Sequence, residues 1–174
     1  MSAPGWLQRM LAGLPNAIKP LRPDDEPPTP ITRARVANYL ARRGYRFVAD
    51  DDGDLTGTWD GNRFWFLLLG NTREILQVRG RWHRTLPLEA RPALALAVND
   101  WNRERIWPKA YIREEGITLA MYAETSADLE GGVNDAQLAQ LLSCGLGSGV
   151  QMFLSFAATI PGPDDLESPD VPNR

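Results

Sequence analysis

The segment RFWFLLLGNTREILQVRG, residues 63–80, decides the fold. It contains two strand-like runs, 63–69 and 74–80, and the Gly70-Asn71 pair between them is a typical turn signal. A connection this short joins neighbouring antiparallel strands. Because FWFLLL is apolar on both faces of its strand, we expect that strand to be covered on both sides, by helices or by a second subunit.

The same pattern extends toward the N-terminus. Two more strand-like runs, 45–49 and 55–59, precede this pair, and each is followed by turn residues, DDDGD and DGN. The four runs together predict an antiparallel meander. A helix is predicted before the meander, since Thr32 suits its N-cap and Gly44 suits the position just after its C-terminus.

Helices and strands continue after the meander. The predicted elements are a helix that begins between Pro87 and Pro92 and ends near Glu104, strands at 109–114 and 117–124, and a helix from Asn134 to about Thr159. Strands and helices thus come in blocks and do not alternate strictly. This arrangement predicts an α+β fold in which helices pack on an antiparallel sheet, in the order α-β-β-β-β-α-β-β-α.

The composition limits the classes of function. The 174-residue chain carries a formal net charge of -3, and its 43% hydrophobic content suffices for one domain with a sizeable core. Residues 31–160 hold 15 basic and 15 acidic residues, so we expect no general binding of nucleic acid or of a membrane surface. A single cysteine, Cys144, allows no internal disulfide. No run approaches the roughly 18 apolar residues of a membrane span and no signal-peptide pattern is found, which predicts a cytoplasmic protein.

Three segments are predicted along the chain. Residues 31–160 form the folded domain, and residues 161–174, rich in proline and acids, form a disordered tail. Residues 1–30 form a short helix, 6–14, followed by a proline-rich linker. The helix carries one apolar stripe, made of Trp6, Leu7, Met10, Leu11 and Leu14. Either the stripe docks on the domain or on a partner, or the segment is a frayed terminus.

The chain supplies few groups for catalysis. His83 is the only histidine and has no nucleophile placed beside it by the sequence, and Cys144 has no assured histidine as its activating base. The aspartates of 50–54 fail the calcium-loop pattern, because the twelfth position would be Arg63 where a glutamate is needed. The run GLGSG at 145–149 matches no nucleotide-binding loop and indicates close helix packing. We therefore expect no enzyme activity, no metal and no cofactor.

A local cluster of arginine and tryptophan is the best candidate for a binding surface. Its residues are Arg79, Arg81, Trp82, Arg105 and Trp107. Arg79 and Arg81 share one face of their strand, and Trp82 lies on the other face. Two interpretations stay open. The arginines pair with nearby acids while the tryptophans pack the seam between sheet and helices, or the cluster binds an anionic or carboxylate-bearing partner.

Five ordered blocks carry a resemblance to a known family. They are GYRFVADDDGDLTGTWDG, EILQVRGRW, WNRERIWPKAY, YAETSADLEGGV and LLSCGLGSG. Over about residues 31–160 the chain resembles the actinobacterial branch of the YbjN family, a group described as "putative sensory transduction regulators". The resemblance implies a fold like that of type III secretion chaperones, which are small α+β dimers that bind partner segments. It implies no enzyme activity and no established ligand.

Three functional hypotheses follow from these observations. The first is a cytoplasmic regulatory or chaperone-like module that forms a homodimer and binds a partner protein near Arg79, Arg81, Trp82 and Trp107. The second is a small-molecule or nucleotide sensor in which arginines hold a phosphate or a carboxylate. The third, an enzyme, is disfavoured by the shortage of nucleophile and base.

Overall fold

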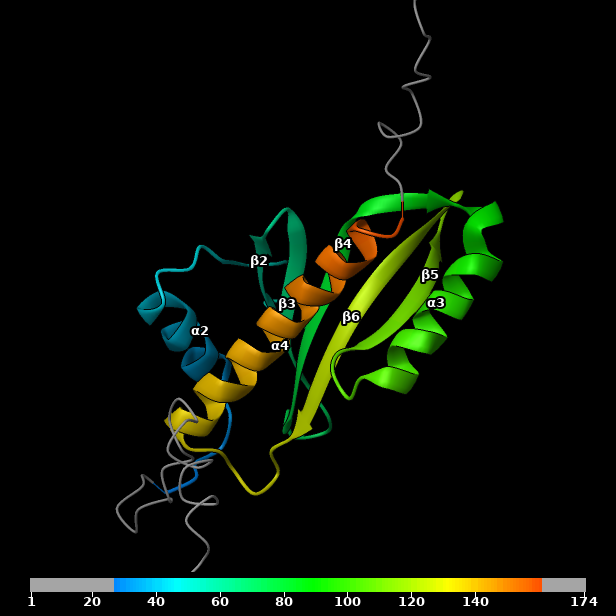
Figure 1. Cartoon of the computed structure of the whole chain (residues 1–174). Helices are drawn as coiled ribbons and strands as arrows, with labels where there is room; N and C mark the ends of the chain where they lie inside the picture. The colour runs from blue at the N-terminus through cyan, green and yellow to red at the C-terminus, as the bar shows by residue number, and fades with distance from the viewer. Residues whose placement is uncertain (1–26, 161–174) are drawn as a thin grey trace, which may run out of the picture.

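The computed structural model describes residues 27–160 of the chain (Figure 1). The predicted N-terminal helix, most of the linker and the predicted acidic tail lie outside these residues. In chain order the elements are α2 (Arg33–Arg42), β1 (Val48–Ala49), β2 (Leu55–Trp59), β3 (Asn62–Leu69), β4 (Ile75–Pro87), the 3₁₀ turn η1 (Leu88–Ala90), α3 (Arg91–Glu104), β5 (Lys109–Glu115), β6 (Thr118–Asp128) and α4 (Asp135–Ala157). The predicted α+β class and the predicted order of helices and strands are confirmed.

All six strands form one antiparallel sheet. Their spatial order is β1-β2-β3-β4-β6-β5, so the first four strands are a meander and β6 pairs with β4. The short turns between strands use residues that tolerate a positive φ, as the Asp60-Gly61 turn between β2 and β3 does with φ values of 50° and 75°. Turn chemistry that is visible in the sequence therefore sets the register of the meander.

Two strands are longer than the sequence predicts. The predicted strand at 74–80 continues to Pro87, because Thr85 to Pro87 pair with the start of β6 after an irregularity in register. The predicted strand at 117–124 continues to Asp128, which lies opposite Ile75. Both extensions depend on pairing between β4 and β6, and the two strands are far apart in the sequence.

The three helices lie on one face of the sheet. Figure 1 shows α4 running diagonally across the sheet, with α2 and α3 on either side of it. The Tyr39 hydroxyl of α2 lies 2.5 Å from Ser143 Oγ of α4, and the rings of Trp101 in α3 and Phe156 in α4 are 5.7 Å apart. Among residues 27–160 no helix covers the opposite face, which we call the open sheet face. The prediction that β3 is covered on both sides is therefore confirmed for one side, which the helices cover. The other side of β3 has no helix over it within residues 27–160.

A close approach between α4 and the sheet determines the position of α4. A Cβ atom on Gly145 would lie 2.8 Å from Val78 Cβ, and one on Gly149 would lie 2.7 Å from Phe64 Cε1. A Cβ atom on Gly147, the third glycine of the run, would lie more than 4 Å from any atom outside its own stretch of helix. The sequence predicted close helix packing here, and the neighbour that requires it is the chain's own sheet.

The length and composition of α4 would also suit a membrane span. The helix has 23 residues and a single charged side chain, Asp135, so by length and composition alone it could cross a membrane. The prediction that no segment approaches this limit is therefore wrong for α4. In the fold, however, Leu138, Leu142 and Phe153 are buried, so the apolar side of α4 packs in the core.

The contact between α4 and the sheet can be tested with two alanines. Gly145→Ala would push a methyl group into the side chain of Val78, and we expect it to lower the free energy of unfolding by about 1–3 kcal/mol. Gly147→Ala is the matched control, and it should raise stability by up to about 1 kcal/mol through helix propensity. Urea unfolding of the two variants measures both effects. Equal stabilities would contradict this account of how α4 packs.

Candidate functional site

The five predicted binding residues lie in three places. Arg79 and Arg81 are on the open sheet face, opposite Trp65 and Arg63 of β3. Trp82 points to the helix-covered face, where it is 1% exposed. Arg105 and Trp107 lie in the loop between α3 and β5. The five residues therefore do not form one continuous surface, and Trp82 belongs to the core.

An ion pair joins the edge strand to the centre of the open sheet face. Arg81 donates hydrogen bonds to Glu115, with its Nη2 2.6 Å and its Nε 3.1 Å from Oε2, and the Tyr122 hydroxyl donates to the same carboxylate. Hydrogen bonding by Arg81 and then by Tyr122 lowers the pKa of Glu115, and the same carboxylate raises the pKa of Arg81. Both charges are therefore held in their ionised forms and neutralise each other.

The second arginine of this face is also paired within the chain. Arg79 Nη2 donates to Gln77 Oε1 at 2.5 Å, and Arg79 Nε lies 3.8 Å from Glu124 Oε2. Beside this pair the rings of Tyr111 and Tyr122 stack with centroids 5.2 Å apart, and burial raises the pKa of Tyr111 to about 12. The interpretation in which arginines pair with acids is confirmed for Arg79, whose partner is Glu124, and for Arg81, whose partner is Glu115.

The open sheet face also contains a hollow of mixed charge. Its volume is about 410 Å³, and its lining residues are Asp50, Asp52, Asp54, Trp65, Leu67, Leu69, Arg79, Arg113 and Tyr122. Three aspartates line it together with two arginines, so it lacks the surplus of positive charge that would favour a phosphate or a carboxylate. The hollow therefore does not favour the sensor hypothesis.

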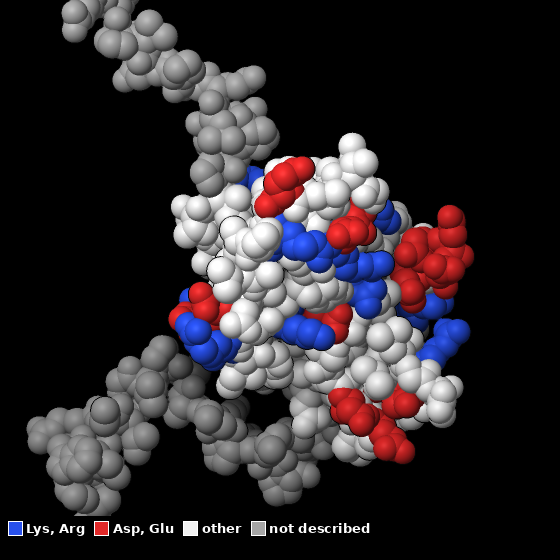
Figure 2. All heavy atoms as spheres, turned by 90° about the vertical axis from the view of Figure 1, so that its right-hand side faces the viewer, with Lys and Arg blue, Asp and Glu red and all other residues white. Residues whose placement is uncertain are grey.

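Charges of both signs also alternate on the side of the molecule where α3 lies (Figure 2). Arg103 Nη1 is 2.8 Å from Asp100 Oδ1, and Arg91 pairs with Glu114 across to β5. Arg105 Nη1 lies 3.4 Å from Glu104 Oε2. Positive charge on this side is therefore balanced locally.

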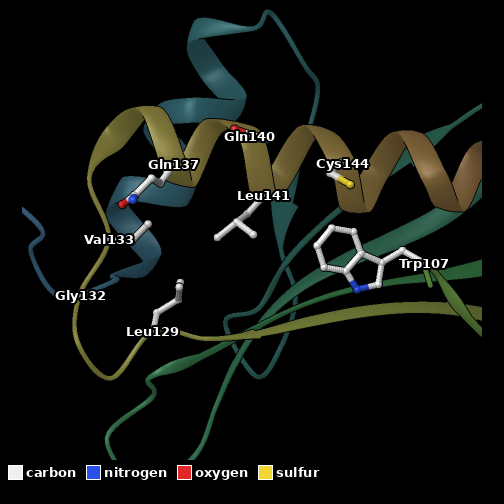
Figure 3. A pocket seen from close by; sticks show the side chains of 8 residues that line it. All are labelled: Trp107, Leu129, Gly132, Val133, Gln137, Gln140, Leu141 and Cys144. Carbon is white, nitrogen blue, oxygen red and sulfur yellow. The ribbon is translucent and has the colours of Figure 1, made fainter. Parts of the chain in front are cut away.

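An apolar groove lies beneath the N-terminal half of α4. Its volume is about 350 Å³, and its lining residues are Trp107, Leu129, Gly132, Val133, Gln137, Gln140, Leu141 and Cys144. In Figure 3 Leu141 points from α4 into the hollow, Leu129 points into it from the opposite side, and the Trp107 indole lies beneath Cys144. We call this feature the apolar groove.

Hydrogen bonds from α3 fix the loop that carries Trp107. Trp101 Nε1 donates to the Pro108 carbonyl at 3.0 Å, and the Asn102 side chain exchanges two hydrogen bonds with the backbone of Ala110. The Arg105 guanidinium stacks 4.1 Å above the Trp101 ring. This anchored loop nevertheless leaves Trp107 45% exposed and its neighbour Ile106 91% exposed. The anchored loop therefore presents two large apolar side chains, Ile106 and Trp107, at the surface.

The opposite wall of the groove is fixed by the start of α4. Asn134 caps the helix. Its side chain accepts a hydrogen bond from the backbone N–H of Gln137, and the Gln137 side chain accepts one from the backbone N–H of Asn134. Arg35 of α2 then binds Asp135 through Nη2 at 2.8 Å and the Val133 carbonyl through the same atom at 2.8 Å. Hydrogen bonding by Arg35 lowers the pKa of Asp135. The wall is thus tied to a second helix.

Of the five binding residues predicted from the sequence, only Trp107 lines this groove. Leu129, Val133 and Leu141 were not predicted as site residues, because the groove is assembled from a loop and a helix that are distant from Trp107 in the chain. Leu141 lies on the last helix and, like Val150, stays partly exposed. Among the eight lining residues there is one thiol and no histidine or carboxylate, so this lining suits binding of an apolar group.

The fold and this groove define a class: a small α+β domain with a helix-covered sheet face, an open sheet face and an apolar groove under its longest helix. The chain belongs to the YbjN family, whose model, described as "Putative bacterial sensory transduction regulator", matches residues 32–158. This match confirms the resemblance found in the sequence, while the actinobacterial branch stays a prediction. No curated protein matches the chain.

Solved structures are also similar to the chain. The "Crystal structure of YbjN, a putative transcription regulator from E. coli" has a TM-score of 0.65 and 15% identity, and covers 77% of this chain and 99% of its own. At this identity the likeness shows the fold alone. The "Structure of the HopA1-SchA Chaperone-Effector Complex" has a TM-score of 0.47 and 14% identity, and covers 74% of this chain and 99% of its own.

The pair of Arg81 and Glu115 predicts a pH-dependent stability. The pKa of Glu115 is lower in the folded chain than in the unfolded chain, where it is about 4.3. The ionised carboxylate therefore stabilises the fold above pH 4.3, and this stabilisation is lost as the pH falls through the pKa of the folded chain. Glu115→Gln should therefore lower the free energy of unfolding at pH 7 by about 1 kcal/mol or less. Below pH 4.3 the free energies of unfolding of Glu115→Gln and of the unsubstituted protein should become equal.

Urea unfolding at pH 7 and at pH 3 measures this difference. Glu89→Gln in η1 is the control, since Glu89 is exposed and makes no ion pair with another residue in the range 27–160. It should change stability little at either pH. A loss for Glu115→Gln that is equal at both pH values would contradict the ion-pair assignment.

Proposed function

We propose that the chain is a non-enzymatic, cytoplasmic regulatory or chaperone-like module that acts as a homodimer and binds a segment of a partner protein in the apolar groove. The observation that carries the proposal is Trp107, which is half-exposed at a hollow of about 350 Å³ although its loop is firmly hydrogen-bonded. The family's description as a sensory transduction regulator supports the regulatory part.

The dimensions and the chemistry of the groove suit one or two apolar side chains of a polypeptide. A volume of about 350 Å³ is at the small end of the range for binding sites. Tryptophan at such a position is typical of the few residues that carry most of the binding energy of an interface. Gln137 and Gln140 add amide donors and acceptors, which can pair with the backbone of a bound segment.

We assign the homodimer contact to the open sheet face. β3 presents the half-buried Trp65 and the exposed Leu69 on this side, and no helix covers them within residues 27–160. Lys109 and Glu124 lie opposite each other on neighbouring strands of the same face. A two-fold axis brings the same patch of each copy together, so charges of both signs on one patch can pair between copies.

Removing the Trp107 side chain tests the partner site. Trp107→Ala should reduce capture of a partner protein from the native cell extract at least about tenfold, because the anchoring aromatic group is lost. Leu96→Ala is the control, since Leu96 is an exposed apolar residue on α3 that does not line the groove. Quantitative mass spectrometry compares the captured proteins. Equal capture by both variants would remove the groove as the partner site.

A charge on β3 tests the dimer surface. Light scattering at micromolar concentration should give twice the monomer mass of 19.4 kDa for the unsubstituted chain. Leu69→Glu places a charge in the proposed contact and should shift the chain to monomer. Ile117→Glu changes an exposed isoleucine between β5 and β6 and should leave the dimer intact. A monomeric unsubstituted chain would eliminate the dimer.

A further inference from the structure

The described part of the chain begins at the edge of the apolar groove. Thr29 and Val133 form an isolated antiparallel bridge, in which the Val133 amide donates to the Thr29 carbonyl at 2.9 Å. The backbone of Pro28 and Thr29 also lies close to Gly132. Gly132 and Val133 both line the groove, so the chain that precedes Thr29 joins the domain beside it.

The preceding chain carries apolar residues that match the apolar lining of the groove. The apolar stripe consists of Trp6, Leu7, Met10, Leu11 and Leu14. No charged residue belongs to the stripe, and no charged side chain lines the groove, so the two match in polarity. Residues 15–26 connect the stripe to the described domain and can reach up to about 40 Å when extended. That reach exceeds what a groove beside Thr29 requires.

We propose that the segment 6–14 docks one or two side chains of its apolar stripe in the apolar groove of its own chain, where it competes with the partner segment. This inference rests on the proposed function, in which the groove binds a polypeptide. The chain's own segment is the occupant because its attachment point lies at the groove edge and because its stripe is uncharged like the lining. The groove is then closed to a partner until the segment leaves.

The attachment to the domain strengthens this competition. A short linker holds its segment at a local concentration on the order of 1 mM near the site. If a free copy of the segment binds the groove with a dissociation constant of about 100 µM, the tethered copy weakens that binding about tenfold. A partner segment must overcome the same factor, so loss of the stripe should make the module a tighter binder.

A labelled peptide of residues 4–16 is the probe for the first test. Its binding to the full-length chain is followed by fluorescence anisotropy and compared with binding to a stripe variant, Trp6→Ser, Leu7→Ser and Leu11→Ser. We expect the peptide to bind the stripe variant about tenfold more tightly, because the groove is free. Adding Trp107→Ala to the stripe variant should abolish this binding. Leu21→Ser, outside the stripe, should behave as the unsubstituted chain.

The position of Cys144 in the groove gives a second measurement. Cys144 is the chain's one cysteine, and it lines the groove from the N-terminal half of α4. Its modification by a thiol reagent should be several-fold slower in the unsubstituted chain than in the stripe variant, at every protein concentration. Protection that grows with concentration would mean that a second copy supplies the segment, and would overturn docking within one chain.

The outcomes separate this inference from the function on which it rests. Equal peptide affinities for the unsubstituted chain and the stripe variant, or no binding to the stripe variant, would overturn the docking of segment 6–14. Partner capture that still depends on Trp107 would then leave the proposed function standing. Capture that is independent of Trp107 would remove the groove as a partner site, whatever the peptide does.

Discussion

The close approach of α4 to the sheet is the constraint on which the rest of the structure depends. Gly145 and Gly149 let the helix backbone approach Val78 and Phe64 at distances that no side chain would permit. Each glycine costs about 1 kcal/mol of helix propensity relative to alanine, so the packing gained must offset that loss. Once α4 is fixed in this position, the direction of every side chain along it is fixed as well.

The position of α4 also determines where the groove opens. Toward its C-terminus α4 contacts the sheet and α3, where Phe153 and Phe156 are buried. Toward its N-terminus it is attached to α2 through Asp135 and Arg35, and the loop with Leu129 and Val133 passes beneath it. The helix spans a gap there that the short side chains of the loop do not fill. Trp107 reaches into the gap from the other side, and the groove results.

The sequence predicted the elements better than the surfaces, for a physical reason. Periodicity and turn chemistry are local, so the helix that follows Thr32 and the antiparallel meander were both predictable. The extension of β4 to Pro87 was not, because it depends on pairing with β6. Strand alternation correctly separated Arg81 from Trp82, but only the tertiary fold shows which face the helices cover. The groove, assembled from distant loops and one helix, has no local signal.

The central strand β4 connects the two surfaces. Its alternate residues point in opposite directions, so Val78 lies under Gly145 while Arg79 lies on the open sheet face. A homodimer through the open face and a partner in the groove would therefore occupy opposite sides of one sheet, and neither would block the other. Because protein interiors are close-packed, a shift of β4 on one side is felt on the other. The pairing of β4 with β3 and the contact of Val78 with Gly145 therefore connect the proposed dimer face to the helix that covers the groove.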